Sequence, residues 1–537
     1  MRGLMQKDDL VLTGILERAL TLYPRSQIVT RTPEGVHRES YEELGERVSR
    51  LANALIDLGV RPGDRVGSFA WNTWRHLELY FAAPCMGAVL HTLNIRLHPE
   101  QVAWIANHAE DRVVFVDASL MPVFQHIAPH LKSVEHVIVM GDGERPDDAL
   151  DYEELLEGSS PEFSWPRLDE EDACAICYTS GTTGDPKGVL YSHRSMVLHA
   201  FGINQAGAVG ITDHDAVLPV VPMFHANAWG MPWAATLAGA KHVFAGQYSA
   251  DPEALVDLIE GERVTIAAGV PTVWIGLLQY LEKNPRDIST IRTITAGGSA
   301  VPKSMIEAFE RHHGLHLVQG WGMTETGPVG TLSHLTPWLE DLPDDERFRI
   351  RAKAGRPIAG VRIRIVDMST GEESPWDGKT MGEVQIKGNW VASAYYGVEA
   401  PERFQDGWLR TGDVGMIDEH GYLILTDRTK DVIKSGGEWI SSIELENALM
   451  AHPAVLEAAV IAVPDERWSE RPLACVVLKE GASATADELR DHLAPSFAKW
   501  WLPERFEFIS EIPKTSVGKF DKKVLRAQFA EARPSTA

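Results

Sequence analysis

Cysteine is scarce in this sequence, with four residues among 537 (Cys85, Cys174, Cys177 and Cys475). Cys174 and Cys177 have the CxxC spacing of a redox pair or of half a metal site, but no second pair accompanies them. Both fall in a short apolar stretch that we expect to be a strand, which favours two buried small side chains. So few cysteines fit a reducing compartment, and we expect the protein to be cytoplasmic.

Long apolar runs are absent as well. No uncharged run approaches the ~20 apolar residues that a membrane-spanning helix requires, so we expect no stable membrane insertion. Near the start of the chain, Glu17 and Arg18 interrupt the apolar stretch 10–20. This interruption argues against a signal peptide.

Positive charge is in deficit, with 51 Lys and Arg residues against 76 Asp and Glu and a formal net charge of −25. Such an excess of negative charge disfavours nucleic acids and anionic membrane surfaces as partners. Any anionic substrate must therefore be bound by cations that the fold places locally.

The sequence does contain regular secondary-structure patterns, and its 44% hydrophobic residues suffice for a large core. Short apolar strands, for example at 65–70, 112–116 and 136–140, alternate with amphipathic helices. One helix is expected to begin at Ser40, which has the capping-box spacing to Glu43. The alternation predicts an α/β fold whose large N-terminal domain contains doubly wound, mostly parallel sheets.

A different pattern begins at about residue 354, where short alternating strands are separated by glycine turns. It predicts a small β-barrel-like subdomain over about 354–427. The residues that follow have an α+β pattern of their own, after the polar stretch 427–432. We therefore divide the chain into a large domain, 1–428, and a small C-terminal domain, 429–537.

The stretch 178–188, which reads YTSGTTGDPKG, holds three glycines, four serine or threonine residues and one lysine. It follows an apolar run, 173–177, so we expect a buried strand that leads into a tight loop. Backbone N–H groups, hydroxyls and the ammonium of Lys187 can surround phosphate oxygens in such a loop. The spacing is not GxxxxGK[ST], and GxGxxG does not occur in the chain. A flexible linker is the alternative, although linkers usually lack a preceding strand.

Three further apolar strands end in polar loops that contain glycine, at about 264–269, 291–300 and 315–326. At the carboxyl edge of a parallel sheet, such loops form a crevice for a ligand. Trp321 could offer a flat face to a purine, and Glu325 a hard oxygen to Mg²⁺. Taken alone, the two residues are also explained by core packing and by a solvated acid.

Several isolated residues elsewhere can be interpreted either as part of a functional site or as ordinary core or surface residues. His225 is either a core histidine or, because it ends a strand, part of a ligand site. The carboxylate of Asp413 suits two vicinal ribose hydroxyls. The loop 513–519 (PKTSVGK) is either a solvated basic tail or, in so acidic a protein, a source of counter-charge for an oxyanion.

The stretch 178–188 resembles the signature loop of the adenylate-forming superfamily, which comprises acyl-CoA synthetases, firefly luciferase and the adenylation domains of peptide synthetases. At least five motifs in the family's order extend this resemblance from the helical N-terminus to Lys519. It implies an AMP-forming acid–thiol ligase that uses ATP, Mg²⁺ and coenzyme A to make an acyl-adenylate and then a thioester. It also implies that the small domain is a mobile lid with Lys430 at the hinge, where many relatives carry Asp.

The resemblance also implies roles for particular residues of this sequence. Catalysis is assigned to Lys519, Thr179, Glu325 and His225. The metal is assigned to Glu325 and Thr179. The acyl pocket is assigned to His225, Trp229, Gly297, Gly298, Gly322 and Pro328. Nucleotide and coenzyme A binding is assigned to Thr179, Ser180, Gly181, Thr182, Thr183, Gly184, Lys187, Gly298, Gln319, Gly320, Trp321, Gly322, Met323, Thr324, Asp413, Arg428, Lys434 and Trp439.

The three tryptophans Trp229, Trp321 and Trp439 make the chain most similar to the medium- and long-chain fatty acyl members of the family. A ligase for a short or sulfur-containing acid such as 3-methylmercaptopropionate is the nearest alternative. A luciferase-like oxygenase and an enzyme that loads a carrier protein are further alternatives. Members of this branch are often dimers, so a homodimer is expected.

Overall fold

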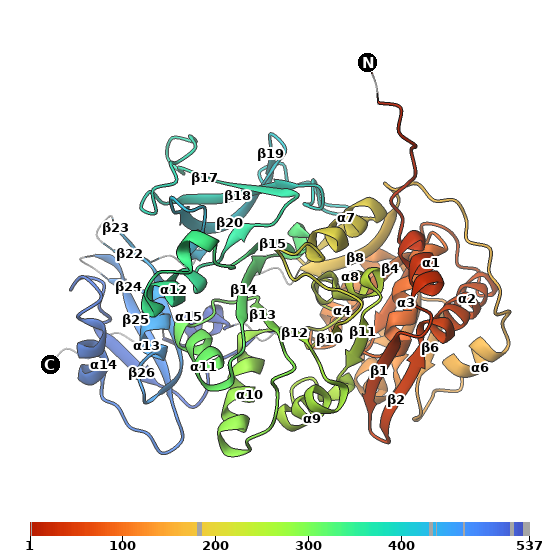
Figure 1. Cartoon of the computed structure of the whole chain (residues 1–537), viewed down its shortest axis with the longest axis horizontal. Coiled ribbons are helices and arrows are strands. Elements are labelled where there is room, and N and C mark those ends of the chain that lie inside the picture. Colours follow the sequence, from red (N-terminus) through yellow and green to blue (C-terminus); the bar gives the residue numbers. More distant parts are fainter. Residues whose placement is uncertain are drawn as a thin grey trace.

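The computed structural model describes residues 1, 3–179, 185–428, 433–435, 438–465, 468–515 and 520–529. At residues 427, 428, 434, 438, 439 and 469 it describes the backbone alone. The elements form two large sheets with helices on their faces, a smaller antiparallel sheet at the top of the view, and a C-terminal α+β unit (Figure 1).

The first large sheet contains the strands on either side of the predicted phosphate loop, 180–184. Its strands, in order across the sheet, are β7 (Leu150–Asp151), β6 (His136–Met140), β5 (Asp111–Asp117), β3 (Arg65–Phe69), β4 (Val89–Thr92), β8 (Ala173–Thr179) and β9 (Lys187–Ser192). Neighbours run parallel except β8 and β9, which form an antiparallel hairpin. Strand β9 does not follow from the sequence patterns, and it leads into α7 (His193–Ile203).

The second large sheet is central to the crevice expected from the sequence. Its order is β16 (Arg356–Pro357), β15 (Val329–Leu332), β14 (Leu317–Gly322), β13 (Thr293–Gly297), β12 (Ile266–Gly269), β10 (Ala216–Pro219), β11 (Lys241–Phe244), β1 (Gln27–Thr32) and β2 (Gly35–Ser40). The strands from β14 to β1 are parallel, and β16, β15 and β2 add antiparallel edges. The carboxyl ends of β13 and β14 therefore meet at one edge.

Helices cover both faces of both sheets, as the doubly wound prediction requires. Between the sheets lie α3 (Trp74–Cys85), which contacts strands of both, and α7 and α8 (Met231–Ala238). The outer face of the first sheet packs on α4 (Pro99–Ala109) and α5 (Met121–Phe124). The outer face of the second packs on α9 (Pro252–Glu262), α10 (Pro271–Lys283) and α11 (Lys303–His313).

The predicted helix start at Ser40 is confirmed. The helix is α2 (Tyr41–Asp57), which packs on α3, as does α1 (Leu12–Leu22). The Ser40 hydroxyl accepts a hydrogen bond from the backbone N–H of Glu43 (3.2 Å), and the Ser40 N–H donates to the Glu43 carboxylate (2.6 Å). Two N–H groups that the helix itself leaves unpaired are thereby satisfied.

The predicted β-rich subdomain is one curled antiparallel sheet (Figure 1). It consists of β17 (Val361–Val366), β18 (Gly382–Gly388), β20 (Trp408–Ile417), β19 (Phe404–Gln405) and β21 (Leu423–Arg428). A backbone hydrogen bond connects this subdomain to the first large sheet. In the segment between β18 and β19, the Tyr396 N–H donates to Gly188 O in the β8–β9 hairpin (2.9 Å).

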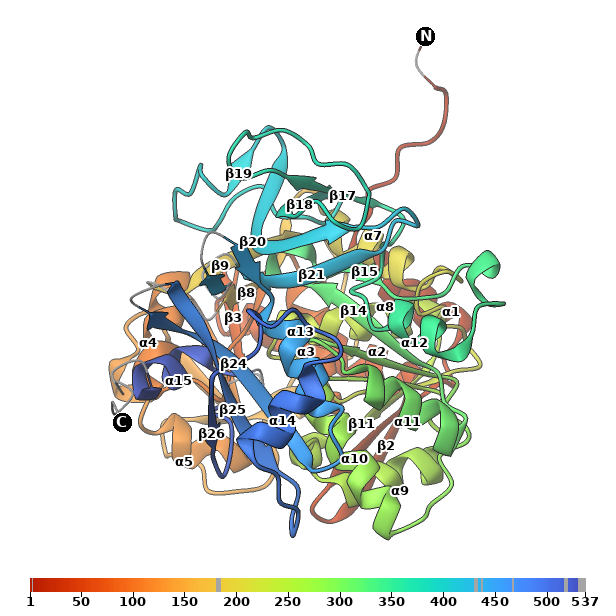
Figure 2. The same cartoon turned by 90° about the vertical axis from the view of Figure 1, so that its left-hand side faces the viewer.

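The C-terminal unit, in blue and facing the viewer in Figure 2, has its own two apolar clusters. It contains β22 (Ile433–Ser435), β23 (Glu438–Ile440), α13 (Ser442–Met450), β24 (Val455–Asp465), β25 (Ser469–Leu478), α14 (Ala486–Leu493), β26 (Arg505–Phe508) and α15 (Lys522–Phe529). It meets the curled sheet where α13 contacts β21, and there the Ser441 hydroxyl donates to Thr426 O (2.8 Å).

The four cysteines are free and buried, as expected for small core side chains. Within the described ranges, every helix is too short or too polar to span a bilayer.

Candidate active site

The phosphate-loop motif connects the two strands of the β8–β9 hairpin. Thr179 ends β8 and faces Lys187, the first residue of β9, and the Thr179 hydroxyl donates to Lys187 O (3.4 Å). Lys187 is therefore anchored in a strand rather than in the loop itself. The predicted phosphate ligands Ser180, Gly181, Thr182, Thr183 and Gly184 lie outside the described residues.

Lys187 and Glu325 come together on either side of one tyrosine, Tyr395. The hydroxyl of Tyr395 donates to Glu325 Oε1 (2.6 Å), and its ring centroid lies 5.0 Å from Lys187 Nζ. Burial, reinforced by the charge of Glu325, raises the pKa of Tyr395, so the phenol remains a donor. Tyr395 is not among the residues expected from the sequence; the tandem tyrosines and glycine at 395–397 are the signal that could have revealed it.

Glu325 is fixed through its backbone as well as its side chain. It lies in a single 3₁₀ turn, η5 (Thr324–Thr326), and its carbonyl accepts from the Ala392 N–H (2.8 Å). The Met323 N–H donates to the Thr326 hydroxyl (2.9 Å), which closes the turn. A Cβ on Gly322 would overlap the carbonyl of Pro328, so glycine is required where β14 enters this turn.

The donor set at Glu325 suits Mg²⁺ that arrives with a nucleotide. Glu325 is 5% exposed, and one of its oxygens is held by Tyr395. Among the described residues, no group of three His, Cys, Asp or Glu side chains could hold a metal alone. Mg²⁺ is commonly bound by one or two carboxylates plus substrate phosphates, and one buried carboxylate that shares Tyr395 with Lys187 fits that pattern.

The residues expected at the nucleoside come from two different sheets. Trp321, near the end of β14, donates its indole N–H to Asp413 Oδ2 on β20 (2.9 Å). Asp413 is paired with Arg428 across the β20–β21 ladder, where the backbone of Arg428 is described. Gln319, two residues before Trp321, accepts from the Val301 N–H through its side-chain oxygen (3.0 Å) and so supports the loop after β13. That loop contains Gly298, whose φ of 85° favours glycine.

The residues expected at the acyl group meet at the ends of β13 and β14. A Cβ on Gly297 would lie 3.3 Å from Trp229 Cη2 and 2.9 Å from Gly320 O. The indole of Trp229 therefore lies against Gly297, and Gly320 is the register partner of Gly297. Trp229 is 8% exposed, and His225, four residues earlier, is half-buried.

Trp229 belongs to an unusual left-handed turn, η3 (Ala226–Gly230). Its φ angles are 45°, 53°, 48°, 57° and 74°, although only the last residue is glycine. Each non-glycine residue in this conformation costs roughly 1–2 kcal/mol, so tertiary contacts must hold the turn. Two buried side chains fix its approach: the Met223 N–H donates to Asn72 Oδ1 (2.7 Å), and the Tyr80 hydroxyl donates to Met223 O (2.6 Å).

The C-terminal part of the expected site is described only in its backbone. Lys434 and Trp439 are register partners in the β22–β23 hairpin. Lys519 and Lys430 lie outside the described residues.

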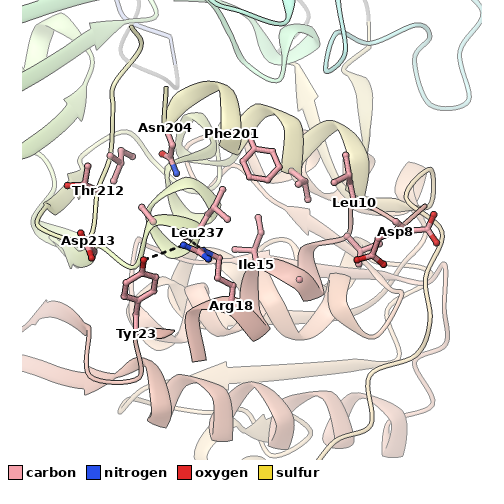
Figure 3. A pocket seen from close by; sticks show the side chains of 16 residues that line it. Asp8, Leu10, Ile15, Arg18, Tyr23, Phe201, Asn204, Thr212, Asp213 and Leu237 are labelled. Carbon is pink, nitrogen blue, oxygen red and sulfur yellow. Dashed lines mark hydrogen bonds between the residues drawn. The ribbon is translucent and has the colours of Figure 1, made fainter. Parts of the chain in front are cut away.

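A cavity of about 630 Å³ lies elsewhere, among α1, α7 and α8 (Figure 3). Its lining includes Leu10, Ile15 and Phe201, with Arg18 donating to the Tyr23 hydroxyl (3.3 Å) at one side. None of the described residues expected at the active site lines it, so it is separate from the constellation around Lys187.

Comparison with known proteins places the chain in a family. Residues 16–396 match the AMP-binding enzyme family, and residues 444–519 match the AMP-binding enzyme C-terminal domain. A long-chain-fatty-acid–CoA ligase from Thermus thermophilus is 49% identical over 530 residues, which is 98% of this chain and 96% of the relative. A 3-methylmercaptopropionyl-CoA ligase from Ruegeria lacuscaerulensis is 43% identical over 540 residues, 99% of each chain.

The fold has solved counterparts. ATP-bound MatB from Rhodopseudomonas palustris superimposes with a TM-score of 0.83 at 27% identity, covering 98% of this chain and 99% of MatB. The resemblance drawn from the sequence motifs is therefore confirmed, as is the α/β fold class. The chain belongs to the family of AMP-binding enzymes and is an ATP-dependent, AMP-forming acyl-CoA ligase.

Proposed function

We propose that the acid activated by this ligase is a medium- to long-chain fatty acid. The observation that carries the proposal is the contact of Trp229 with Gly297 at the end of β13, beside the strand that leads to Trp321. A wall of indole and glycine suits an acyl chain, because each buried CH₂ contributes ~0.8 kcal/mol. The name of the Thermus thermophilus relative supports the same substrate class.

A second candidate is a short sulfur-containing acid, 3-methylmercaptopropionate, because the Ruegeria lacuscaerulensis relative has that specificity in its name. Pyrophosphate release measured with acids from acetate to palmitate, and with 3-methylmercaptopropionate, separates the two. We expect kcat/KM to rise with chain length. A maximum at 3-methylmercaptopropionate would favour the second candidate, and a steep preference for aryl acids would overturn both.

For the first half-reaction, we propose that Lys187 and the loop 180–184 bind the outer phosphates of ATP, while Glu325 and Thr179 hold Mg²⁺. The bound Mg²⁺ would neutralise phosphate charge. The carboxylate oxygen of the acid then bonds to the α-phosphorus, and the bond to the pyrophosphate oxygen breaks. Negative charge grows on the non-bridging oxygens of the α-phosphate as the carboxylate approaches ATP, which is also an anion. The protein's main contribution is therefore to position the reactants and to supply cations. Lys519 bridges the carboxylate and the α-phosphate.

The nucleoside is proposed to stack on Trp321, with its ribose hydroxyls on Asp413 and Arg428. The indole N–H already occupies one oxygen of Asp413, which orients the carboxylate before the ribose arrives. Gln319, Gly320, Met323 and Thr324 would complete the walls around the base and the α-phosphate.

We propose that residues 429–537 form a lid that turns about Lys430 between the two half-reactions. The separate apolar clusters of this unit support such a motion. After rotation, Lys434 and Trp439 would line the entry for coenzyme A, whose sulfur attacks the acyl carbon and displaces AMP. Adenylation and thioester formation would be kept separate, because Lys519 leaves the site as the thiol enters.

A homodimer and a cytoplasmic location also belong to the proposal. The four free, buried cysteines agree with a reducing compartment. Sedimentation velocity at two protein concentrations would test the dimer.

A further inference from the structure

Tyr395 contacts both Glu325 and Lys187, the two charged groups that are proposed to bind Mg²⁺ and the phosphates of ATP. Its hydroxyl is bonded to Glu325, and its ring faces the ammonium of Lys187. The tyrosine is 7% exposed and packs edge-on against Phe404, with ring centroids 5.2 Å apart. Its position is therefore fixed by packing as well as by polar contacts.

The backbone around Tyr395 is attached at both ends to the segments that it serves. We call residues 392–396 the strap. At one end of the strap, the Ala392 N–H donates to Glu325 O (2.8 Å); at the other, the Tyr396 N–H donates to Gly188 O (2.9 Å), next to Lys187. The strap thus connects the turn of Glu325 to the β8–β9 hairpin, and Tyr395 lies between them.

A neutral aromatic donor has a specific advantage at this position. Neither Lys187 nor Glu325 forms an ion pair with any other residue that the structure describes, although they share Tyr395 as a neighbour. If the two side chains met directly, they would form an ion pair, and neither charge would be available to the metal or to phosphate. A phenol orients the carboxylate without neutralising it, and the face of the ring attracts the ammonium by its quadrupole.

We propose that Tyr395 is a positioning residue for the Mg·ATP site: its hydroxyl orients the Glu325 carboxylate for the metal, and its ring holds Lys187 apart from that carboxylate and available to phosphate. The inference rests on the proposed roles of Glu325 and Lys187. It assigns two functions to two parts of one side chain, and the hydroxyl can be removed while the ring is kept.

The test measures binding rather than turnover. Mn²⁺ serves as the metal probe, with its Kd determined by electron paramagnetic resonance in the presence of α,β-methylene-ATP, which cannot react at the α-phosphate. Inorganic pyrophosphate without metal serves as the probe for Lys187. Tyr395→Phe keeps the ring and removes the hydroxyl; Tyr395→Leu removes both.

Tyr395→Phe is expected to raise the Kd of Mn²⁺ about ten-fold, the usual weight of a hydrogen bond to a charged group, and to leave the Kd of pyrophosphate within about two-fold. Tyr395→Leu is expected to raise both, pyrophosphate by about three-fold for the lost cation–π contact. The matched control is Tyr422→Phe, which removes another buried hydroxyl, one that is bonded to His334 O (2.7 Å) and not to Glu325. It should change neither Kd.

Three results would overturn the proposal. In the first, Tyr395→Phe leaves Mn²⁺ binding unchanged although Glu325→Gln weakens it; the metal assignment then stands, and the role of Tyr395 is wrong. In the second, Glu325→Gln itself has no effect, so the metal assignment fails and the proposal falls with it. In the third, Tyr422→Phe weakens Mn²⁺ binding as much as Tyr395→Phe, which would reveal a general loss of stability.

Discussion

Replacing Gly297 by alanine tests whether the wall that it forms with Trp229 binds the acyl chain. The new Cβ would lie 3.3 Å from Trp229 Cη2 and 2.9 Å from Gly320 O. Carbon atoms pack best at about 3.5–4.0 Å, so the indole or the strand must move by a few tenths of an ångström. Overpacking of this kind costs ~1–3 kcal/mol. That cost falls on the stability of the fold. The loss in kcat/KM comes from the acyl groups that the displaced indole no longer buries, at ~0.8 kcal/mol or roughly four-fold for each CH₂.

The assay is pyrophosphate release with a series of saturated acids from butyrate to palmitate. Acids long enough to reach the indole should lose most of their kcat/KM, and shorter acids should lose less. The new Cβ also presses on Gly320 O, which belongs to the proposed nucleotide wall, so the KM for ATP can rise as well. The diagnostic result is therefore a loss of kcat/KM that grows with the length of the acid.

The matched control is Gly276→Ala on α10, where a Cβ would meet only Pro252 Cγ, at an ordinary 3.7 Å. This variant should behave as the wild type with every acid. An equal loss for all acids in Gly297→Ala would refute the reasoning, since it would show that the strand had moved and not the acyl wall. A rise in the KM for ATP alone would do the same.

Three further predictions address the nucleotide, the lid and the stability of the large domain. Trp321→Phe keeps an aromatic face but removes the donor to Asp413, so the KM for ATP should rise about ten-fold while the KM for the acid stays constant, as measured by steady-state kinetics. Lys519→Ala should abolish ATP–pyrophosphate exchange yet still convert supplied acyl-AMP to thioester; equal loss of both half-reactions would contradict its assigned role. Burial raises the pKa of Glu39 to about 8, despite Arg47 nearby (3.9 Å), so its protonated form stabilises the fold below pH 4.5 and this contribution is lost as the pH rises toward 8. The Tm of Glu39→Gln should therefore fall less than that of the wild type between pH 5 and pH 8, and parallel curves in differential scanning calorimetry would exclude a titration of Glu39.

The sequence was sufficient for much of the alternation of strands and helices and for the side chains near the strand ends. It did not predict β9, nor β1 and β2 in the N-terminal region that was expected to be helical. The strand before the phosphate loop, the start of α2 at Ser40 and the glycine-containing ends of β13 and β14 all follow from local patterns: apolar runs, a capping box and glycines. Local patterns also placed Trp321 and Asp413 among the candidates, although the hydrogen bond between them joins strands of two different sheets.

Tyr395 could not be found in this way, because its importance depends on a tertiary contact. It lies in an irregular segment between β18 and β19, and only the backbone bonds of the strap to Glu325 and Gly188 bring it into the site. The strand β9 was missed for a related reason. Its buried residues, Val189 and Tyr191, alternate with exposed Leu190, but six residues give too short a pattern beside a glycine-rich loop.

The left-handed turn η3 also restricts how this enzyme can evolve. Branched side chains such as Val, Ile and Thr clash with the backbone at positive φ, so positions 226–229 are closed to the residues that would most simply narrow or reshape the acyl wall. Glycine is the replacement that the turn accepts most easily, and it can only enlarge the space. A narrower acyl wall must therefore be built from the opposite side, where Gly297 lies on a regular strand but any Cβ already meets Gly320 O at 2.9 Å.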